Sequence, residues 1–130
     1  MTDKQALLQA VDVHQDQLLA LLDRLISFET MSPPARNTVA IQRFLDDELT
    51  KIGFRTKREA FYEGDELLSA EKAGTDAANY HSLLLNGHVD VATVDRQSWH
   101  TDPFKLVRKG DLLYGRGVSA VSYTHLRAHE

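Results

Sequence analysis

A histidine and an aspartate, His88 and Asp90, stand two residues apart just after an apolar run of three leucines, residues 83–85. A neutral imidazole is a good zinc ligand, and a nearby carboxylate can fix its tautomer or supply an oxygen ligand. Side chains two apart on a strand point to the same face, so the pair can share one pocket. Alone it is a weak signal, because a hydrogen-bonded histidine at a strand end has the same pattern.

The composition limits which ligands and partners the pair can have. The chain has 130 residues and no cysteine, so any metal must be held by His, Asp or Glu, and a reducing cytoplasm fits the sequence. The net charge is −4 with no basic run, which disfavours nucleic acid as a partner. No stretch approaches the roughly 18–20 apolar residues of a membrane span. We expect a soluble, cytoplasmic protein with one core and no membrane partner.

Two helices are predicted before the pair. The first ends before Pro33 and Pro34, which cannot continue a helix. The second starts at Asn37, a good N-cap, and stops at Gly53. We expect the polar face of the second helix to be solvated and give it no functional role. The predicted apolar stripes are Val11, Val13, Leu18, Leu21, Leu22, Leu25 and Ile26 in the first helix, and Val39, Ile41, Phe44, Leu45, Leu49 and Ile52 in the second.

The remaining pattern predicts strands. Residues 54–62 alternate as a strand does, and residues 66–70 form a second, short candidate, followed by a loop. The continuous apolar run in 81–88 indicates a strand buried on both faces, which would put His88 at its carboxyl end, where ligands gather in open α/β sheets. Residues 104–117 read as a hairpin with its turn at 109–111. The expected fold class is α/β, a mixed sheet flanked by helices.

Motifs around the pair resemble those of a known family. "LLLNGHVDV", Trp99, "DPF" at 102–104 and "LYGRGVS" at 113–119 come in an order that resembles the dinuclear zinc aminoacylase and carboxypeptidase family, which includes acetylornithine deacetylase and succinyl-diaminopimelate desuccinylase. The "SPPARN" loop and both helices are also similar, so the resemblance covers about residues 10–119. It implies that residues 1–119 are the N-terminal part of a zinc-peptidase catalytic domain, present here as a truncated piece.

The resemblance also implies a site with two zinc ions, or cobalt in their place. His88 matches the family's first metal ligand, and Asp90 matches the catalytic-site aspartate that supports it. The bridging aspartate normally follows "GRGVS" directly, and Ala120 stands there, with a methyl group that cannot coordinate a cation. The general base, the other ligands and a second domain would lie downstream. We therefore expect this fragment to be inactive.

For the intact protein, the resemblance implies hydrolysis of the amide bond in N-acyl amino acids or small peptides, as in acetylornithine deacetylase. Such a protein could form homodimers. Two alternatives remain open for the 130-residue chain: a non-catalytic α/β fragment, or a weak metal-binding module with no enzymatic role.

Several other residues receive structural interpretations. Arg116 could bind a substrate carboxylate, although bracing a loop is the more frequent role of such an arginine, and Trp99 and Phe104 are expected to pack. Residues 120–130 are interpreted as a non-native tail. Its His125 and His129 do not form a metalloprotease motif, because Leu126 occupies the place of the required glutamate.

Overall fold

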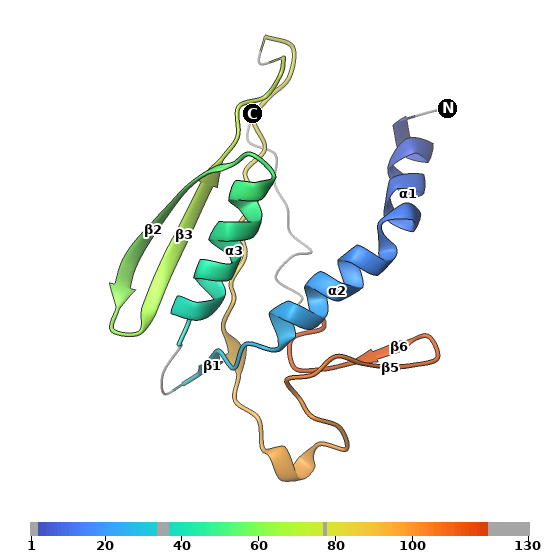
Figure 1. The fold of residues 1–130 in the computed structure, drawn as a ribbon, viewed down its shortest axis with the longest axis vertical. Helices are drawn as coiled ribbons and strands as arrows, with labels where there is room; N and C mark the ends of the chain where they lie inside the picture. The colour runs from blue at the N-terminus through green and yellow to red at the C-terminus, as the bar shows by residue number, and fades with distance from the viewer. Residues whose placement is uncertain (1–2, 34–36, 77, 120–130) are drawn as a thin grey trace. The chain divides into compact units, whose positions relative to one another are not determined.

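The computed structural model describes residues 3–33, 37–76 and 78–119. They fall into two compact units (Figure 1). The first combines the chain up to Phe28 with Asp95–Val118, and the second is built on Glu29–Val94. Ala120 and the expected tail lie outside the described residues. No helix among those residues has the length and apolar character needed to span a bilayer.

In the first unit, the predicted single helix is two helices, α1 (Asp3–Val13) and α2 (Gln15–Ile26). The prediction was wrong at His14, whose ψ of 9° departs from helical geometry. Hydrogen bonds continue across the break, from the His14 N–H to the Ala10 carbonyl and from the Leu18 N–H to the His14 carbonyl. One residue with altered dihedrals leaves the apolar spacing intact, so the periodicity could not reveal the break.

The same unit contains the predicted hairpin, formed by β5 (Val107–Lys109) and β6 (Leu112–Tyr114) after a short 3-10 turn, η1 (Arg96–Ser98). Gly110 supplies the positive φ of 60° that the tight turn needs. The prediction of this hairpin is therefore confirmed.

The end of α2 anchors the loop that follows β6. Ile26 and Phe104 are buried in this unit, and Pro103 is buried beside Phe104. A Cβ added at Gly115 would lie 3.2 Å from two side-chain carbons of Ile26 and 3.2 Å from Val118, so any larger residue there would have to displace these side chains by a few tenths of an ångström. The Asp23 carboxylate of α2 also accepts a 3.0 Å hydrogen bond from the Leu106 N–H. Segments far apart in sequence are thus held together in one small core.

In the second unit, α3 (Val39–Lys51) lies along the antiparallel hairpin of β2 (Arg55–Tyr62) and β3 (Asp65–Glu71), as Figure 1 shows. Both strands were predicted, and Gly53 has the expected positive φ after the helix, 86°. The predicted cap was wrong by one residue. Thr38 is the N-cap, while Asn37 has a φ of 50° and belongs to the preceding turn.

A buried polar cluster fixes the start of α3 to the start of β3. The Thr38 hydroxyl donates to the Asp65 carboxylate and lies 2.9 Å from the Glu66 N–H, which donates to it. The Gln42 side-chain amide donates to the Glu66 carbonyl at 3.0 Å. Thr38, Gln42 and Asp65 are all buried, and such groups are tolerated in a core because each has a hydrogen-bond partner.

Asp46 on α3 was expected to be solvated, and it is instead half-buried in an ion-pair network. Arg58 of β2 donates to Asp46 at 2.8 Å and to Glu66 at 2.8 Å, and the Thr56 hydroxyl donates to Asp46 at 2.5 Å. These hydrogen bonds, first from Thr56 and then from Arg58, lower the pKa of Asp46 below its ordinary 3.8. The network stabilises α3 against the hairpin only while the carboxylate is ionised.

We expect the variant Asp46→Asn to unfold more easily than the wild type at about pH 7, and the difference to disappear at about pH 2. A carboxyl group whose pKa falls on folding stabilises the native state above its ordinary pKa, and this contribution is lost as the pH drops through the lower, folded value. The difference in stability is measured by the urea midpoints of the wild type and the variant at both pH values. Asp47→Asn, at an exposed neighbour on the same helix, is the control. A difference of the same size at both pH values would contradict the prediction.

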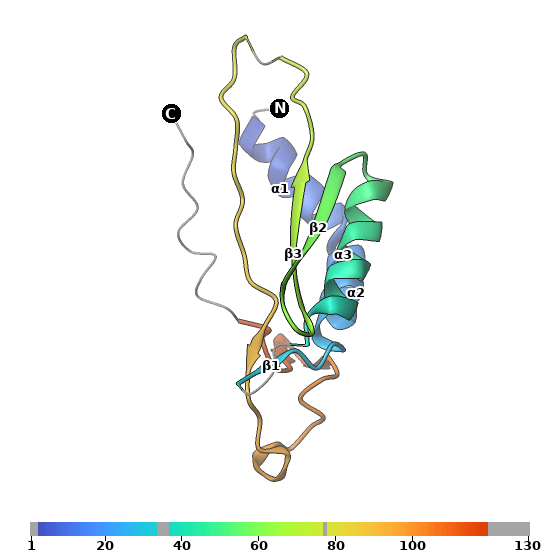
Figure 2. The same cartoon turned by 90° about the vertical axis from the view of Figure 1, so that its left-hand side faces the viewer.

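The expected buried strand at 81–88 is absent from the described structure. Apart from a single bridge at Leu83, pairing begins only at β4 (Val91–Ala92), which runs parallel to β1 (Met31–Ser32). Figure 2 shows β1 beside the short orange arrow of β4. Leu83, Leu84 and Leu85 are each 64% exposed. Burial on two faces requires neighbours on both sides, and the apolar run alone does not provide them.

Candidate metal centre

His88 and Asp90 are in hydrogen-bond contact. The His88 Nδ1 atom lies 2.9 Å from the backbone carbonyl oxygen of Asp90 and 3.1 Å from its side-chain Oδ1. The side chains are 52% and 38% exposed, so the pair sits at the surface of its unit. The structure therefore brings together the two residues that the sequence singled out.

The two contacts determine which tautomer the neutral ring adopts. A carbonyl oxygen and an ionised carboxylate can only accept hydrogen bonds, so Nδ1 of His88 must carry the proton. In the neutral ring, Nε2 then holds the lone pair. An imidazole whose Nδ1–H is bound to a carbonyl or carboxylate has the usual arrangement of a metal-binding histidine.

The location of the pair differs from the prediction. His88 precedes β4 and does not follow a buried strand, and Asp90 lies directly before the first residue of β4. The two side chains meet through the local hydrogen bonds to Nδ1 and not because a strand presents both on one face. The expectation that the site lies at the carboxyl end of the 81–88 strand was wrong for this reason.

Thr30 holds the backbone beneath the pair, and no sequence pattern singled it out. Its hydroxyl donates to the Val89 carbonyl at 2.5 Å, and its own carbonyl accepts from the Val91 N–H at 2.9 Å. Thr30 is 2% exposed. Two strands of two residues each leave no periodic signal, so the parallel pairing that places Thr30 here could not be read from the sequence.

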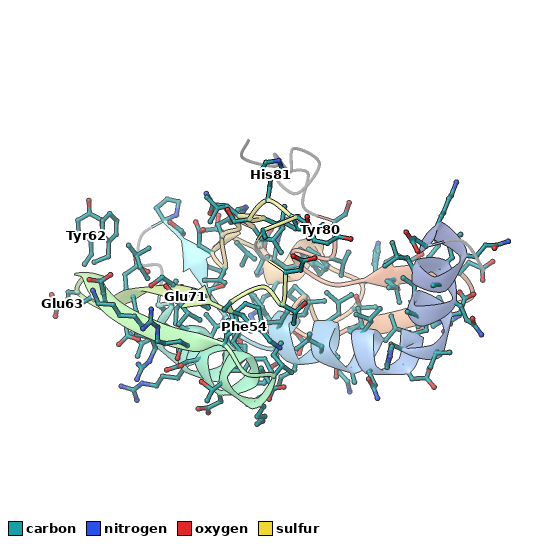
Figure 3. All side chains as sticks on the ribbon, turned by 90° about the horizontal axis from the view of Figure 1, so that it is seen from above. Phe54, Tyr62, Glu63, Glu71, Tyr80 and His81 are labelled. Atoms are coloured by element: carbon teal, nitrogen blue, oxygen red, sulfur yellow. The ribbon has the colours of Figure 1, made fainter. Side chains whose placement is uncertain are left out.

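The described residues can be tested for their fit to a metal ion. His88 fits a ligand by its tautomer and exposure, and Asp90 fits the group that orients it. Across 3–33, 37–76 and 78–119, no three His, Cys, Asp or Glu side chains come together in a group that could hold a metal ion. His81 is exposed, and Figure 3 shows it projecting from the outer side of the ribbon.

The glycine-rich loop in the other unit contains an arginine stacked on an aromatic ring. The guanidinium carbon of Arg116 lies 5.2 Å from the centre of the Trp99 ring, and the backbone N–H of Arg116 donates to the Pro103 carbonyl at 2.6 Å. Arg96 stacks on Phe104 in the same way, at 5.3 Å. These are the bracing and packing contacts expected of Arg116, Trp99 and Phe104.

Comparisons with known proteins found relatives that match most of the chain. The chain is 43% identical over 115 residues to the N-formyl-4-amino-5-aminomethyl-2-methylpyrimidine deformylase of Bacillus subtilis, covering 88% of the chain and 27% of that enzyme. It is 32% identical to the succinyl-diaminopimelate desuccinylase of Anaplasma marginale, covering 80% of the chain and 26% of the relative. The crystal structure of human carnosine dipeptidase 1 matches 84% of the chain and 26% of that protein with a TM-score of 0.67 and 27% identity. No family model matches the chain.

The partial α/β fold and these relatives define the class, that of metallopeptidase-like α/β domains. The chain belongs to the aminoacylase and carboxypeptidase family of metallopeptidases, as the sequence resemblance indicated. It spans about a quarter of the length of the curated relatives it matches.

Proposed function

We propose that this chain supplies one metal ligand, His88, and its orienting carboxylate, Asp90, to the centre of a zinc-dependent amide hydrolase. The observation that carries the proposal is the contact of His88 Nδ1 with two acceptors of Asp90, at 2.9 and 3.1 Å, which fixes the tautomer in which Nε2, and not Nδ1, carries the lone pair of the neutral ring. The relatives supply the reaction class. None of those named above is an acetylornithine deacetylase, so the substrate is proposed only as a class.

In this proposal, each residue has a defined task. Asp90 keeps the His88 ring in the Nδ1–H tautomer and at a fixed angle, because its backbone carbonyl oxygen and its side-chain Oδ1 both accept from Nδ1. His88 presents a neutral nitrogen ligand. A bound zinc ion would polarise the scissile carbonyl and lower the pKa of a water molecule towards ~7. Cobalt could take the place of zinc, since both accept imidazole and oxygen ligands.

The substrate class proposed is a small molecule with an N-acyl amide bond, such as an N-acyl amino acid or a short peptide. The relatives named above are a deformylase of an N-formyl amine, a desuccinylase and a dipeptidase, and what they share is hydrolysis of an amide bond in a small molecule. We place the protein in the cytoplasm, in agreement with its lack of cysteine. Any homodimer is proposed for the longer protein alone.

The domain assignment is also a proposal. Residues 1–119 are taken as part of the catalytic domain, and residues 120–130 as a tail of foreign sequence, because "AVSYTHLRAHE" stands where the family has its bridging aspartate. The nucleotide sequence beyond codon 119 tests this assignment. An aspartate codon there, in another reading frame or after a deletion, would support it.

The test of the site is a Zn²⁺ titration of the 130-residue chain, followed by NMR of the histidine ring nitrogens. We expect the His88 signals to shift at lower Zn²⁺ concentration than those of the other histidines, and the first binding step to vanish in His88→Ala. His81→Ala, which removes an exposed histidine of the same unit, is the matched control and should keep that step. If Zn²⁺ moved His81 and His88 together, or left His88 unmoved, the proposed ligand would be wrong.

A further inference from the structure

We propose that Thr30 is a positioning residue for the His88–Asp90 pair, an inference that rests on the proposed function of that pair. Thr30 touches neither a substrate nor the reacting atoms. It fixes the backbone on both sides of Asp90, and Asp90 in turn orients the imidazole.

The argument begins with the two peptide units that flank Asp90. The first contains the Val89 carbonyl, which accepts from the Thr30 hydroxyl at 2.5 Å. The second contains the Val91 N–H, which donates to the Thr30 carbonyl at 2.9 Å. Peptide units are planar, so only φ and ψ of Asp90 lie between them. One threonine therefore holds both planes and restricts both soft dihedrals of Asp90.

The second of these peptide units also reaches the histidine. Its carbonyl oxygen belongs to Asp90 and lies 2.9 Å from Nδ1 of His88. The N–H end of the unit is tied to Thr30, and its C=O end is tied to the ring. The direction of the Asp90 side chain follows from the same backbone, and its Oδ1 is the second acceptor of Nδ1, at 3.1 Å. A change at Thr30 is therefore transmitted to both acceptors of the ring.

The burial of Thr30 makes this tie effective. The residue is 2% exposed, whereas the site residues themselves are partly exposed. The hydrogen bond to the half-buried Val89 carbonyl is partly shielded from water, which strengthens it relative to an exposed one. Buried Thr30 thus holds the backbone of Asp90 in place, while the side chains of His88 and Asp90 are partly exposed to solvent.

The test compares the tautomer of the His88 ring in three proteins without any metal, at a fixed pH where the ring is neutral. In Thr30→Val, which keeps the size and the backbone carbonyl but lacks the hydroxyl, we expect the Nδ1–H to Nε2–H ratio of His88 to fall roughly two- to twelvefold, the factor that corresponds to the loss of one ordinary hydrogen bond. Thr30→Ser should restore the ratio. The ring of His81, in the same unit, should not change in either variant.

A purely structural threonine would give a different result. Loss of stability in Thr30→Val with an unchanged His88 ratio would overturn the proposal, because the β1–β4 pairing would then be all that the hydroxyl supports. If the valine variant does not fold, Thr30→Cys decides, since it keeps the size and only a weak S–H donor: an unchanged ratio again overturns it, and a lowered ratio supports it. If the Zn²⁺ titration showed no binding at His88, the proposed function would be wrong. The tautomer ratios measured without metal would still test the role of Thr30.

Discussion

Incubated with Zn²⁺ or Co²⁺ and an N-acetyl amino acid, the 130-residue chain is expected to release no acetate above the rate of its His88→Ala variant. Ala120 stands where the family resemblance requires the aspartate that bridges two metal ions, and a methyl group provides no lone pair. Metal affinity and water activation both come from several ligands held together. One imidazole and one supporting carboxylate do not make such a centre.

The expected effect is large, because enzymes accelerate their reactions by about a million-fold or more, and the loss of the centre removes that acceleration. Amine release measured by a sensitive fluorogenic assay is the suitable readout. His88→Ala, purified in the same way, controls for contaminating hydrolases. Turnover that the wild-type chain shows and this variant lacks would contradict the prediction and would mean that the chain completes a site by itself.

Replacement of Ile41 by alanine is expected to lower the free energy of unfolding of the second unit by about 2–5 kcal/mol. Ile41 is 3% exposed on the face of α3 that packs on the β2–β3 hairpin. The substitution removes three carbon atoms from a small core and leaves a cavity, and the cost of both adds up. Urea denaturation measures the change in the free energy of unfolding. Hydrogen exchange of the β2 and β3 amides then shows whether the change lies in the second unit.

Arg43→Ala serves as the matched control, because it truncates an exposed side chain two residues away on the same helix. It should change the free energy of unfolding by no more than about 0.5 kcal/mol. Equal effects at positions 41 and 43 would show that α3 does not bury Ile41 in solution. An effect of Ile41→Ala on the amides of α2 as large as on those of β2 would show that the two units unfold together.

The sequence predicted well the elements whose signals are local. The helix α3, the positive φ at Gly53 and the strand β2 each depend on residues within one or two turns of chain, and the structure confirms them. The alternation read into β2 does not appear as alternate burial, because all of its residues except Thr56 are exposed. The hairpin of β5 and β6 was found for the same reason, since Gly110 marks its turn. The pair His88 and Asp90 was found because both residue types stand close together in the chain.

Features that depend on distant neighbours were not predicted correctly. The leucines at 83–85 have the composition of a buried strand, but only neighbouring strands on both sides can bury them, and each is 64% exposed. Thr30 was missed because its partner Val89 is 59 residues away and the strands that join them have two residues each. The sequence alone does not indicate that a threonine hydroxyl will be buried or which group it will bind.

The pairing of β1 with β4 has a consequence for the order in which this chain folds. Each hairpin can close as soon as its own few residues are present, whereas the Thr30–Val89 contact spans 59 residues and must pay the entropy of closing that long loop first. Contacts of large sequence separation form late and slowly. During synthesis, then, we expect His88 to acquire its final setting only after the β2–β3 hairpin is complete, as the last step in the assembly of this unit.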